Sequence, residues 1–458
     1  MTDRSTPKIL IVDPVGLAAG PDGRPDTAAV RAHVAARGGR FHDGPLGADA
    51  PEPGVAHFYY CPDLSTPEAL RAVAGGGAYD AVIAAATALP ADLPFPEGGV
   101  RIGAGTGNMG CDSWGGGDGT GGAAPLMNTP GLNATATAQM AWKALMAVRP
   151  DLPLATLNDL TAEGAFDTGR DLARFPTAKL EGCRLAVIGY GNIGREVAKL
   201  GRAFGMRVAV FARPRHRDWI EAEGFGFAAT PEAAAAGADV LSVHLGLGPK
   251  TPEGFANAGL IGAAVLGALA PGAVVLNFDR GELVDADALA AGLGSGALGH
   301  AAIDADLFRD AATGALSGPM LPYLALAQRF PDRLTLLPHA AADTDHPTRV
   351  AGACQAIDQI LGAIRDRRVV NLKGDLPPGY VAGGTTRPHG VGGLAAGALA
   401  ALPAALRGAL AAEAATLQRE IGALGRDPAG ADARALMLAA NRLQTLMAQA
   451  GLAGPLLP

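Results

Sequence analysis

Three glycines in the stretch LAVIGYGNIGREVA, residues 185–198, restrict the fold more than any other feature of the chain. Gly189, Gly191 and Gly194 follow an apolar segment that we expect to be a strand, and they open a segment with a helical pattern. In such a turn, the first glycine permits a tight bend, the second lets the backbone approach a pyrophosphate, and the third lets the helix pack on the strand. The helix N–H groups would face the phosphates. The stretch therefore predicts a dinucleotide-binding βαβ unit.

Apolar segments alternate with helical patterns along both halves of the chain. Strands are expected at 8–13, 56–61, 79–87, 99–108, 184–188, 207–211, 239–243, 273–276, 299–303 and 334–337. This alternation predicts parallel sheets covered by helices on both faces. At 458 residues the chain is too long for one ordinary core, so we expect an α/β protein with two doubly wound domains.

Composition excludes several other classes of protein. The formal net charge is −7, which argues against general binding to nucleic acid or to acidic membrane surfaces. The four cysteines lie far apart without a CxxC pair, so neither a metal site nor a disulfide framework is expected. The N-terminus lacks the apolar core of a signal peptide, and no apolar run reaches membrane-spanning length. We therefore expect a cytoplasmic protein.

The strand at 207–211 runs into a basic segment where an acidic residue is usual. In dinucleotide-binding folds this position holds Asp or Glu for the ribose hydroxyls, but here it holds Ala212. Arg213, Arg215 and Arg217 follow, and they can supply charge-assisted hydrogen bonds to a 2′-phosphate. We therefore predict NADP as the cofactor, with NAD possible. A solvated basic loop is the simpler alternative.

Six further stretches surround the glycine turn in a family-specific order. They are GAGTGN (103–108), MNTPGLNATATAQ (127–139), LSVHLGL (241–247), VVLNFDRGELVD (274–285), GHAAIDADLFRD (299–310) and LTLLPHAAADT (334–344). Together they resemble the D-isomer-specific 2-hydroxyacid dehydrogenase family, which includes phosphoglycerate dehydrogenases and glyoxylate/hydroxypyruvate reductases. The resemblance spans roughly residues 1–380.

The resemblance implies a flavodoxin-like substrate domain, a Rossmann cofactor domain and an active site in the cleft between them. The cofactor domain is inserted into the substrate domain. We expect the substrate domain at 1–143 and 340–380, the Rossmann domain at 144–339, a linker at 381–394 and a helical extension at 395–458.

The helical extension follows from a leucine pattern that the resemblance does not cover. Leucines from Leu399 to Leu424 recur at steps of three, four and seven, which is typical of one helix face. A second helix is expected at 431–450, with Leu436 and Leu443 on its own stripe. We expect this hairpin to dock on the body or across a subunit interface of a homodimer or larger homo-oligomer. A mobile Ala-rich tail is the alternative.

The resemblance also implies roles for individual residues. Arg280 matches the substrate arginine, whose planar fork suits a carboxylate and an adjacent carbonyl. His339 matches the acid/base, and a histidine titrates near neutrality. Gly105 and Thr106 match the loop whose backbone N–H groups hold the substrate carboxylate. The expected cofactor-binding residues are Gly189, Gly191, Asn192, Ile193, Gly194, Arg213, Arg215, His244 and Asp304.

Two departures from the family pattern affect this site. Arg309 stands where the family has a glutamate that holds the imidazole of the acid/base. We therefore predict Asp306 or Asp310 as the carboxylate partner of His339. Asp279 stands where the family has a small residue, and it could pair with the neighbouring arginine or another cation. Without the family context, the arginine and histidine would read as ordinary salt-bridge and capping residues.

The absence of one arginine indicates which class of substrate the chain binds. Phosphoglycerate dehydrogenases usually carry an RSxT stretch whose arginine meets the substrate phosphate, whereas here the stretch is AAAT with Ala84 at the arginine position. We therefore expect a small unphosphorylated 2-oxo acid as substrate. A phosphoglycerate dehydrogenase using NAD and a dinucleotide-sensing binding protein with weak or no turnover are the alternatives.

Overall fold

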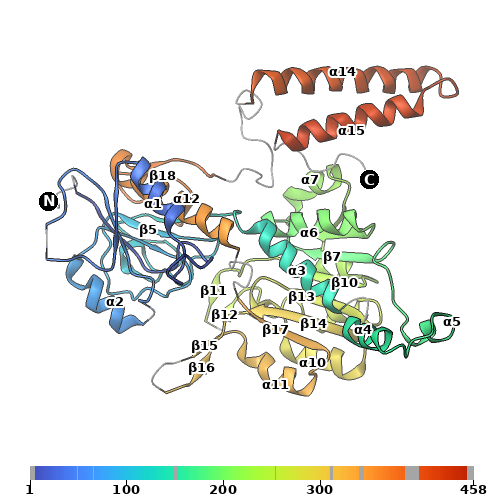
Figure 1. The fold of residues 1–458 in the computed structure, drawn as a ribbon, viewed down its shortest axis with the longest axis horizontal. Coiled ribbons are helices and arrows are strands. Elements are labelled where there is room, and N and C mark those ends of the chain that lie inside the picture. The colour runs from blue at the N-terminus through green and yellow to red at the C-terminus, as the bar shows by residue number, and fades with distance from the viewer. Residues whose placement is uncertain are drawn as a thin grey trace. The chain divides into compact units, whose positions relative to one another are not determined.

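The computed structural model of the chain describes residues 6–48, 50–64, 66–148, 153–252, 254–309, 313–339, 345–386 and 402–450 (Figure 1). The chain forms two compact units. Unit 1 comprises Met1–Ala136 and Ala342–Arg387, and unit 2 comprises Thr137–Ala341 and Pro388–Pro458. The finer boundaries expected from the sequence stay a prediction.

Unit 1 is built on a seven-stranded sheet in the order β19-β6-β5-β4-β1-β3-β2. The strands are β1 (Lys8–Ile11), β2 (Arg40–Asp43), β3 (His57–Tyr60), β4 (Ala81–Ala84), β5 (Gly98–Arg101), β6 (Leu126–Asn128) and β19 (Leu372–Lys373). Six strands run parallel, and β19 pairs with β6 in the antiparallel sense. Without the edge strands β2 and β19, the order is that of a flavodoxin-like sheet, as expected.

Helices cover both faces of this sheet. Helices α1 (Ala28–Ala36) and α12 (His346–Asp366) pack on one face, and α2 (Pro67–Ala74) packs on the other. The strands contribute apolar residues to both cores, as parallel strands buried on both sides must. Helix α12 follows the first segment of unit 2, Thr137–Ala341, in the sequence, so the returning chain completes the core of unit 1.

Unit 2 is built on a parallel seven-stranded sheet in the order β17-β14-β13-β10-β7-β8-β9. The strands are β7 (Arg184–Ile188), β8 (Arg207–Phe211), β9 (Gly226–Ala228), β10 (Val240–Val243), β13 (Ala273–Asn277), β14 (Leu298–Ala305) and β17 (Leu334–Pro338). This is the Rossmann order, which confirms the predicted fold class. The strand order reverses between β7 and β10, and ligands bind such folds at the carboxyl ends of the strands beside this point.

Unit 2 also carries helices on both faces of its sheet. Helices α3 (Ala134–Val148), α6 (Asn192–Ala203) and α7 (Arg217–Ala222) pack on one face. The other face carries α8 (Pro231–Ala235), α9 (Ala263–Gly267), α10 (Ala286–Ser295) and α11 (Leu321–Arg329). Each sheet face therefore has its own apolar core that helices cover. The loops at the strand ends do not cover either core.

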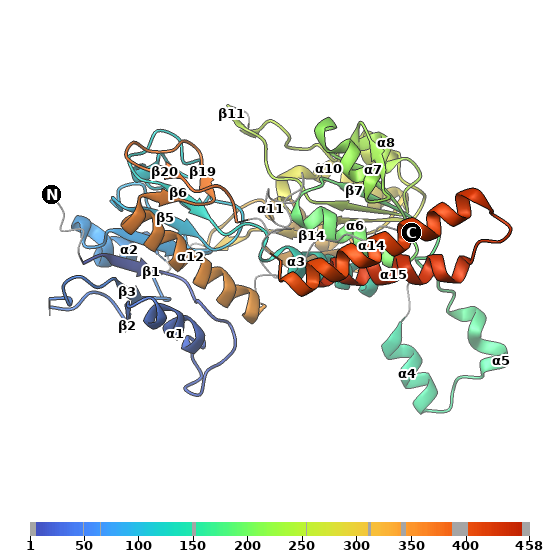
Figure 2. The ribbon, with the colours of Figure 1, turned by 90° about the horizontal axis from the view of Figure 1, so that it is seen from above.

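Some elements differ from the expectations drawn from the sequence. The stretch expected to be irregular before residue 178 contains α4 (Leu154–Ala162) and α5 (Thr168–Asp171). No residue of α4 is buried, and Figure 2 shows this helix apart from the sheet of unit 2. Several short strands, among them β2, β6, β9 and β19, were not expected, because two to four residues carry too little periodicity.

The expected C-terminal hairpin is present. Helices α14 (Ala404–Arg426) and α15 (Ala433–Gln449) lie side by side (Figures 1 and 2). Pro403 caps the start of α14 instead of interrupting it, and Leu399 lies outside the described residues. Ile421 and Met437 keep 54% and 64% of their surface exposed, so the docking of this hairpin stays a prediction. Among the described residues, none of the helices has both the length and the apolar character needed to cross a bilayer.

Candidate active site

The sequence-predicted residues of unit 2 gather at one edge of its sheet. Neighbouring strands end together, since Ile188 of β7 pairs with Val243 of β10, and Val243 pairs with Asn277 of β13. On the far side, Ala305 of β14 pairs with Pro338 of β17. The residues that lie at or just beyond these carboxyl ends are Gly189, Ala212, His244, Arg280, Asp304 and His339.

His339 lies between a carboxylate and a guanidinium. Its Nδ1 is 2.8 Å from Oδ1 of Asp304, and its Nε2 is 3.4 Å from Nη1 of Arg280. A guanidinium can only donate, so Nε2 accepts and Nδ1 carries the proton that is donated to Asp304. The Asp304 side chain is 6% exposed, whereas that of His339 is 21% exposed. The arrangement orients the imidazole, with Nδ1 toward Asp304 and Nε2 toward Arg280, and leaves its ring accessible.

Asp304 therefore holds the position that the sequence led us to expect for Asp306 or Asp310. Asp306 is the wrong residue, because its Oδ2 lies 3.6 Å from Nη1 of Arg280 instead. Asp310 lies outside the described residues. The backbone explains the choice of partner: the N–H of His339 donates to the carbonyl of Ala305, which keeps the imidazole beside the end of β14.

Buried polar groups fix the loop that carries Arg280. The side-chain amide of Asn277 donates to the carbonyl of Arg280 at 2.9 Å and accepts from the N–H of Asp279 at 3.3 Å. The hydroxyl of Tyr323 lies 2.7 Å from the carbonyl oxygens of both Gly281 and Val284. The loop is held from both sides, so the guanidinium is presented by a rigid turn.

Asp279 carries a partly buried carboxyl group without a partner. Within the described part of the chain, its carboxylate makes neither an ion pair nor a hydrogen bond, since Arg280 pairs with Asp306. Burial raises the pKa of Asp279 to about 7, and the negative charge of Asp304 adds to this rise while Arg280 and His339 oppose it. The site thus contains a carboxyl group that changes its charge near neutrality.

The glycine turn fits a pyrophosphate. Gly189 has a φ of +104°, and a Cβ there would lie 2.3 Å from the carbonyl oxygen of His244. A Cβ on Gly194 would lie 2.0 Å from the carbonyl oxygen of Gly189. Beside Gly191, in contrast, a Cβ would meet nothing within 4 Å. Open space therefore lies at the N-terminus of α6, where the first N–H groups, starting at Asn192 and Ile193, have no helical partner.

The basic segment after β8 presents two exposed cations. Ala212 is buried, and Arg213 and Arg215 are exposed. Burial, and then the charges of these two arginines, lower the pKa of His216, and Nε of Arg215 lies 3.5 Å from Nε2 of His216. Arg217 differs, because it pairs with Glu221 at 2.9 Å.

His244 is a buried neutral imidazole beside the glycine turn. Its Nε2 lies 2.7 Å from the hydroxyl of Ser242, and burial lowers its pKa to about 3. Within the described residues, Nδ1 of His244 is buried without a hydrogen-bond partner. A buried polar atom without a partner is costly, so this nitrogen fits a contact to a bound molecule.

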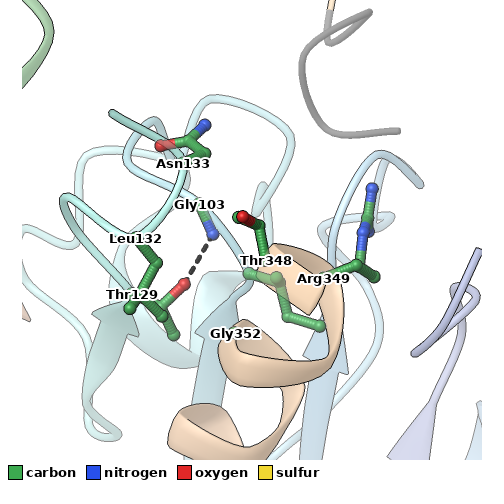
Figure 3. A pocket seen from close by; sticks show the side chains of 8 residues that line it. Gly103, Thr129, Leu132, Asn133, Thr348, Arg349 and Gly352 are labelled. Atoms are coloured by element: carbon green, nitrogen blue, oxygen red, sulfur yellow. Dashed lines mark hydrogen bonds between the residues drawn. The ribbon is translucent and has the colours of Figure 1, made fainter. Parts of the chain in front are cut away.

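In unit 1, side chains hold the loop that carries Gly105 and Thr106. The hydroxyl of Thr129 accepts from the N–H of Gly103 at 2.7 Å, at the edge of a small pocket that Thr348 and Arg349 of α12 also line (Figure 3). In the part of the chain that the structure describes, the N–H groups of Gly105 and Thr106 have no partner. Two free N–H groups on a fixed loop suit a carboxylate.

A second loop of unit 1 has its donors already occupied. Asp13 accepts backbone hydrogen bonds from Ala85, Ala86 and Thr87 at 2.6, 3.2 and 3.1 Å, and its other oxygen accepts from the Thr87 hydroxyl at 3.0 Å. This loop follows Ala84, the position where phosphoglycerate dehydrogenases carry an arginine. An internal carboxylate thus satisfies the donors of this loop.

Comparison with known proteins decides the family. A family model described as "D-isomer specific 2-hydroxyacid dehydrogenase, NAD binding domain" matches residues 153–340. A glyoxylate reductase from Aeropyrum pernix is 31% identical over 257 residues, which make up 56% of this chain and 69% of that protein. The chain belongs to the D-isomer-specific 2-hydroxyacid dehydrogenase family.

Other similar proteins match this chain with a lower sequence identity. A D-3-phosphoglycerate dehydrogenase from Methanocaldococcus jannaschii is 26% identical, over 54% of this chain and 43% of that protein. The solved structure of a glyoxylate reductase from Paecilomyes thermophila matches with a TM-score of 0.53 and 19% identity, over 80% of this chain and 98% of that one. At this identity the structure supports the fold alone.

A dehydrogenase of this family requires a cation for an anionic substrate and an acid/base for the hydroxyl. Arg280 and His339, 3.4 Å apart, have the matching chemistry. Reasoning from the sequence did not find Asn277 or the carboxylate role of Asp13. The sequence does contain a signal for Asn277, because this polar residue ends the apolar run VVLN. No sequence pattern indicated the role of Asp13, since its partners are three backbone N–H groups and one hydroxyl, all 72 to 74 residues away.

Proposed function

We propose that the chain is an NADP(H)-dependent reductase of a small unphosphorylated 2-oxo acid, in the manner of a glyoxylate or hydroxypyruvate reductase. The observation that carries the proposal is the array of Asp304, His339 and Arg280 at the carboxyl ends of β13, β14 and β17. The nicotinamide cofactor supplies the hydride when it is bound. Every other requirement of the reaction falls on side chains and backbone groups of the chain.

His339 is the proposed proton donor to the substrate oxygen. Reduction of a 2-oxo acid consumes one proton, which the imidazolium gives from Nε2. Asp304, hydrogen-bonded to Nδ1, stabilises the imidazolium and keeps Nε2 directed to the reacting oxygen. In the reverse direction the neutral imidazole accepts the proton from the hydroxyl.

Arg280 is the proposed substrate-binding cation. Its fork can hold the substrate carboxylate and polarise the neighbouring carbonyl at the same time. In the structure its Nη1 faces His339 and Asp306. We infer that an anionic substrate replaces the imidazole as acceptor for this donor, which frees Nε2 for the substrate oxygen. The resemblance to the family implies that Gly105 and Thr106 of unit 1 bind the substrate carboxylate through their backbone N–H groups, and this role stays a prediction.

The cofactor preference rests on the end of β8. An aspartate or glutamate there would repel a 2′-phosphate, and Ala212 has no charge to do so. The exposed Arg213 and Arg215 are the proposed 2′-phosphate ligands. The free Nδ1 of His244 and the open space at Gly191 support a bound dinucleotide along the same edge.

The choice of an unphosphorylated substrate rests on the loop after β4. A dianionic phosphate needs cations or free N–H donors. In this loop Ala84 replaces the arginine and Asp13 takes the N–H groups, while the guanidinium of Arg101 beside it already donates to the carbonyl of Ala85 at 3.0 Å. A phosphoglycerate dehydrogenase activity would therefore require a different phosphate site.

A spectrophotometric screen tests this proposal. NADPH oxidation is measured with glyoxylate, hydroxypyruvate and 3-phosphohydroxypyruvate, with His339→Asn as the matched inactive control. We expect turnover of the first two and little of the third. Preference for the phosphorylated acid would support a phosphoglycerate dehydrogenase. Tight binding of NADPH without any turnover would support the sensing alternative.

A further inference from the structure

A buried cluster of polar side chains joins the glycine turn to helix α7. Tyr190 lies between the first two glycines of the turn, Arg195 follows the third on α6, and Glu223 directly follows α7. Nε of Arg195 donates to both carboxylate oxygens of Glu223, at 2.8 and 2.9 Å, and the hydroxyl of Tyr190 donates to Oε2 of the same group. The side chains of Arg195 and Glu223 are only 8% and 11% exposed. One carboxylate therefore ties the end of α7 both to the turn and to α6.

Further contacts reinforce this attachment of α7. Burial, and then the hydrogen bond to Glu223, raise the pKa of Tyr190, so its hydroxyl keeps the proton that it donates. A second arginine of α6, Arg202, donates to the backbone carbonyl of Glu223, and its guanidinium lies 4.5 Å over the ring of Phe225. The ring of Tyr190 meets the same ring edge-on, with 6.2 Å between the centroids. Because a buried ion pair loses much stability when one partner is removed, α7 has little freedom to shift against α6.

Helix α7 in turn fixes the basic segment that follows β8. The helix starts directly after the short helical turn Pro214–His216, which contains Arg215 and which Arg213 precedes. Ala212 on one side of this segment and Ile220 on the other are buried in the same apolar core. Any shift of α7 against α6 therefore moves Arg213 and Arg215 relative to the glycine turn.

We propose that Tyr190, Arg195 and Glu223 are positioning residues for cofactor selection, which hold Arg213 and Arg215 at the distance from the glycine turn that NADPH requires. This inference rests on the proposed function. The pyrophosphate and the 2′-phosphate belong to one molecule, so a protein that binds both must keep the two binding elements in register. NADH uses the glycine turn but has no 2′-phosphate. Loss of this register should therefore weaken the use of NADPH far more than that of NADH.

The test is the ratio of kcat/KM for NADPH to kcat/KM for NADH, with the Kd of each cofactor measured by fluorescence. Glu223→Gln keeps the size of the side chain and removes the charge that holds Arg195. We expect the ratio to fall about tenfold, the value of one misaligned charge-assisted hydrogen bond, with little change for NADH. Electrostatics alone predicts the opposite, because removal of a carboxylate near the basic segment favours a 2′-phosphate. Glu221→Gln is the matched control, since it removes an exposed carboxylate of the same helix that pairs with Arg217, and the ratio should not fall.

Two further variants complete the test. Tyr190→Phe keeps the ion pair and the packing of the ring, so the ratio should fall less, by about two- to fourfold, and this variant decides the matter if Glu223→Gln does not fold. Added to the alanine substitutions of Arg213 and Arg215, Glu223→Gln should lower the ratio no further than the two alanines do alone.

Three results would overturn the inference and leave the proposed function intact: an unchanged or raised ratio in the single variants that fold, equal losses for both cofactors, or an additive loss in the combined variant. A fourth result separates the two proposals. If the two alanines alone leave the ratio of the natural protein unchanged, the cofactor assignment of the proposed function fails, and this inference fails with it.

Discussion

Nδ1 of His339 donates a 2.8 Å hydrogen bond to Asp304, whose side chain is almost completely buried. This pair requires that the proton of the neutral imidazole stays on Nδ1, because Asp304 accepts it and Arg280 donates to Nε2. An amide in place of the carboxylate would allow the ring to carry its proton on Nε2. Asp304→Asn is therefore expected to lower kcat by about a hundredfold or more, in line with the loss of an orienting carboxylate.

The measurement is steady-state NADPH oxidation with glyoxylate, together with NADPH binding by fluorescence. Asp306→Asn is the control, because Asp306 faces the guanidinium and not the imidazole. An unchanged kcat in Asp304→Asn would contradict the proposed role of this hydrogen bond.

Substitution of Arg280 and substitution of His339 should change KM and kcat in different ways. Arg280→Ala removes the proposed carboxylate contact, so KM should rise and kcat should fall with it. His339→Ala removes the proton donor, so kcat should fall by about a hundredfold or more with a smaller change in KM. Both parameters are read from initial rates with glyoxylate and hydroxypyruvate. Normal reduction by the His339 variant would rule out the mechanism.

The exposed arginines after β8 should determine the preference for NADPH over NADH. The double substitution of Arg213 and Arg215 by alanine is expected to lower the preference for NADPH over NADH by about 10- to 100-fold, the value of one or two charge-assisted hydrogen bonds. Arg217→Ala is the control, since its guanidinium is occupied by Glu221. The test compares kcat/KM for the two cofactors. Equal discrimination in the natural protein and the double variant would refute the assignment.

Asp279 should also make stability depend on pH. Its pKa is about 7 in the folded chain against 3.8 for the ordinary group, so between these values the unfolded chain loses the proton and the folded chain keeps it. The free energy of unfolding contributed by Asp279 therefore falls as pH rises from about 4 to about 7, and then levels off. Asp279→Asn removes this loss, on the order of a few kcal/mol at full effect.

Melting temperatures of the natural protein and Asp279→Asn should accordingly be similar at acidic pH and diverge toward pH 7 and above, with the variant more stable. Asp332→Asn, which removes an exposed carboxylate, controls for the change in net charge. A constant difference between the two melting temperatures across this range would show that burial does not control the ionisation of Asp279.

The C-terminal hairpin should contribute to assembly or stability. Ile421, Leu424, Met437 and Leu438 expose large apolar surfaces on α14 and α15. Covering one such side chain contributes about 1.5–3 kcal/mol, so we expect removal of the hairpin to lower the mass of the assembly or its melting temperature. The truncation should follow Thr386, because this residue is hydrogen-bonded to Asn371.

The assembly is measured by light scattering and the melting by calorimetry. Met437→Glu tests the apolar surface in the full-length chain, and Arg434→Glu on the same helix is its charge control. If the truncated chain keeps both its mass and its melting temperature, and protease removes the hairpin at once from the intact protein, the extension is a free tail.

The sequence predicted those features that depend on local pattern. Glycine spacing and the apolar alternation gave both sheets, because each strand and turn is encoded within a few residues. Short strands such as β2 were not predicted, since RFHD is polar and forms a strand only by pairing with β3. The carboxylate partner of His339 was not predicted correctly for a related reason. Whether Asp304 or Asp306 reaches the imidazole depends on the register of β14 against β17, which one strand alone does not encode.

The position of α12 has a consequence for how the chain matures. This helix fills the apolar face of unit 1 with Ala353, Ile357 and Ile360, yet it follows strands β1 to β6 by roughly 200 residues. At about 5–20 residues per second, the ribosome delivers it on the order of tens of seconds after the sheet that it covers. The seven-stranded sheet of unit 2 and the helices α6 to α11 that cover it all lie before α12 in the sequence, so they are synthesised before then. The sheet of the second domain in the sequence is therefore covered first, while one face of the first sheet waits with only α1 packed on it.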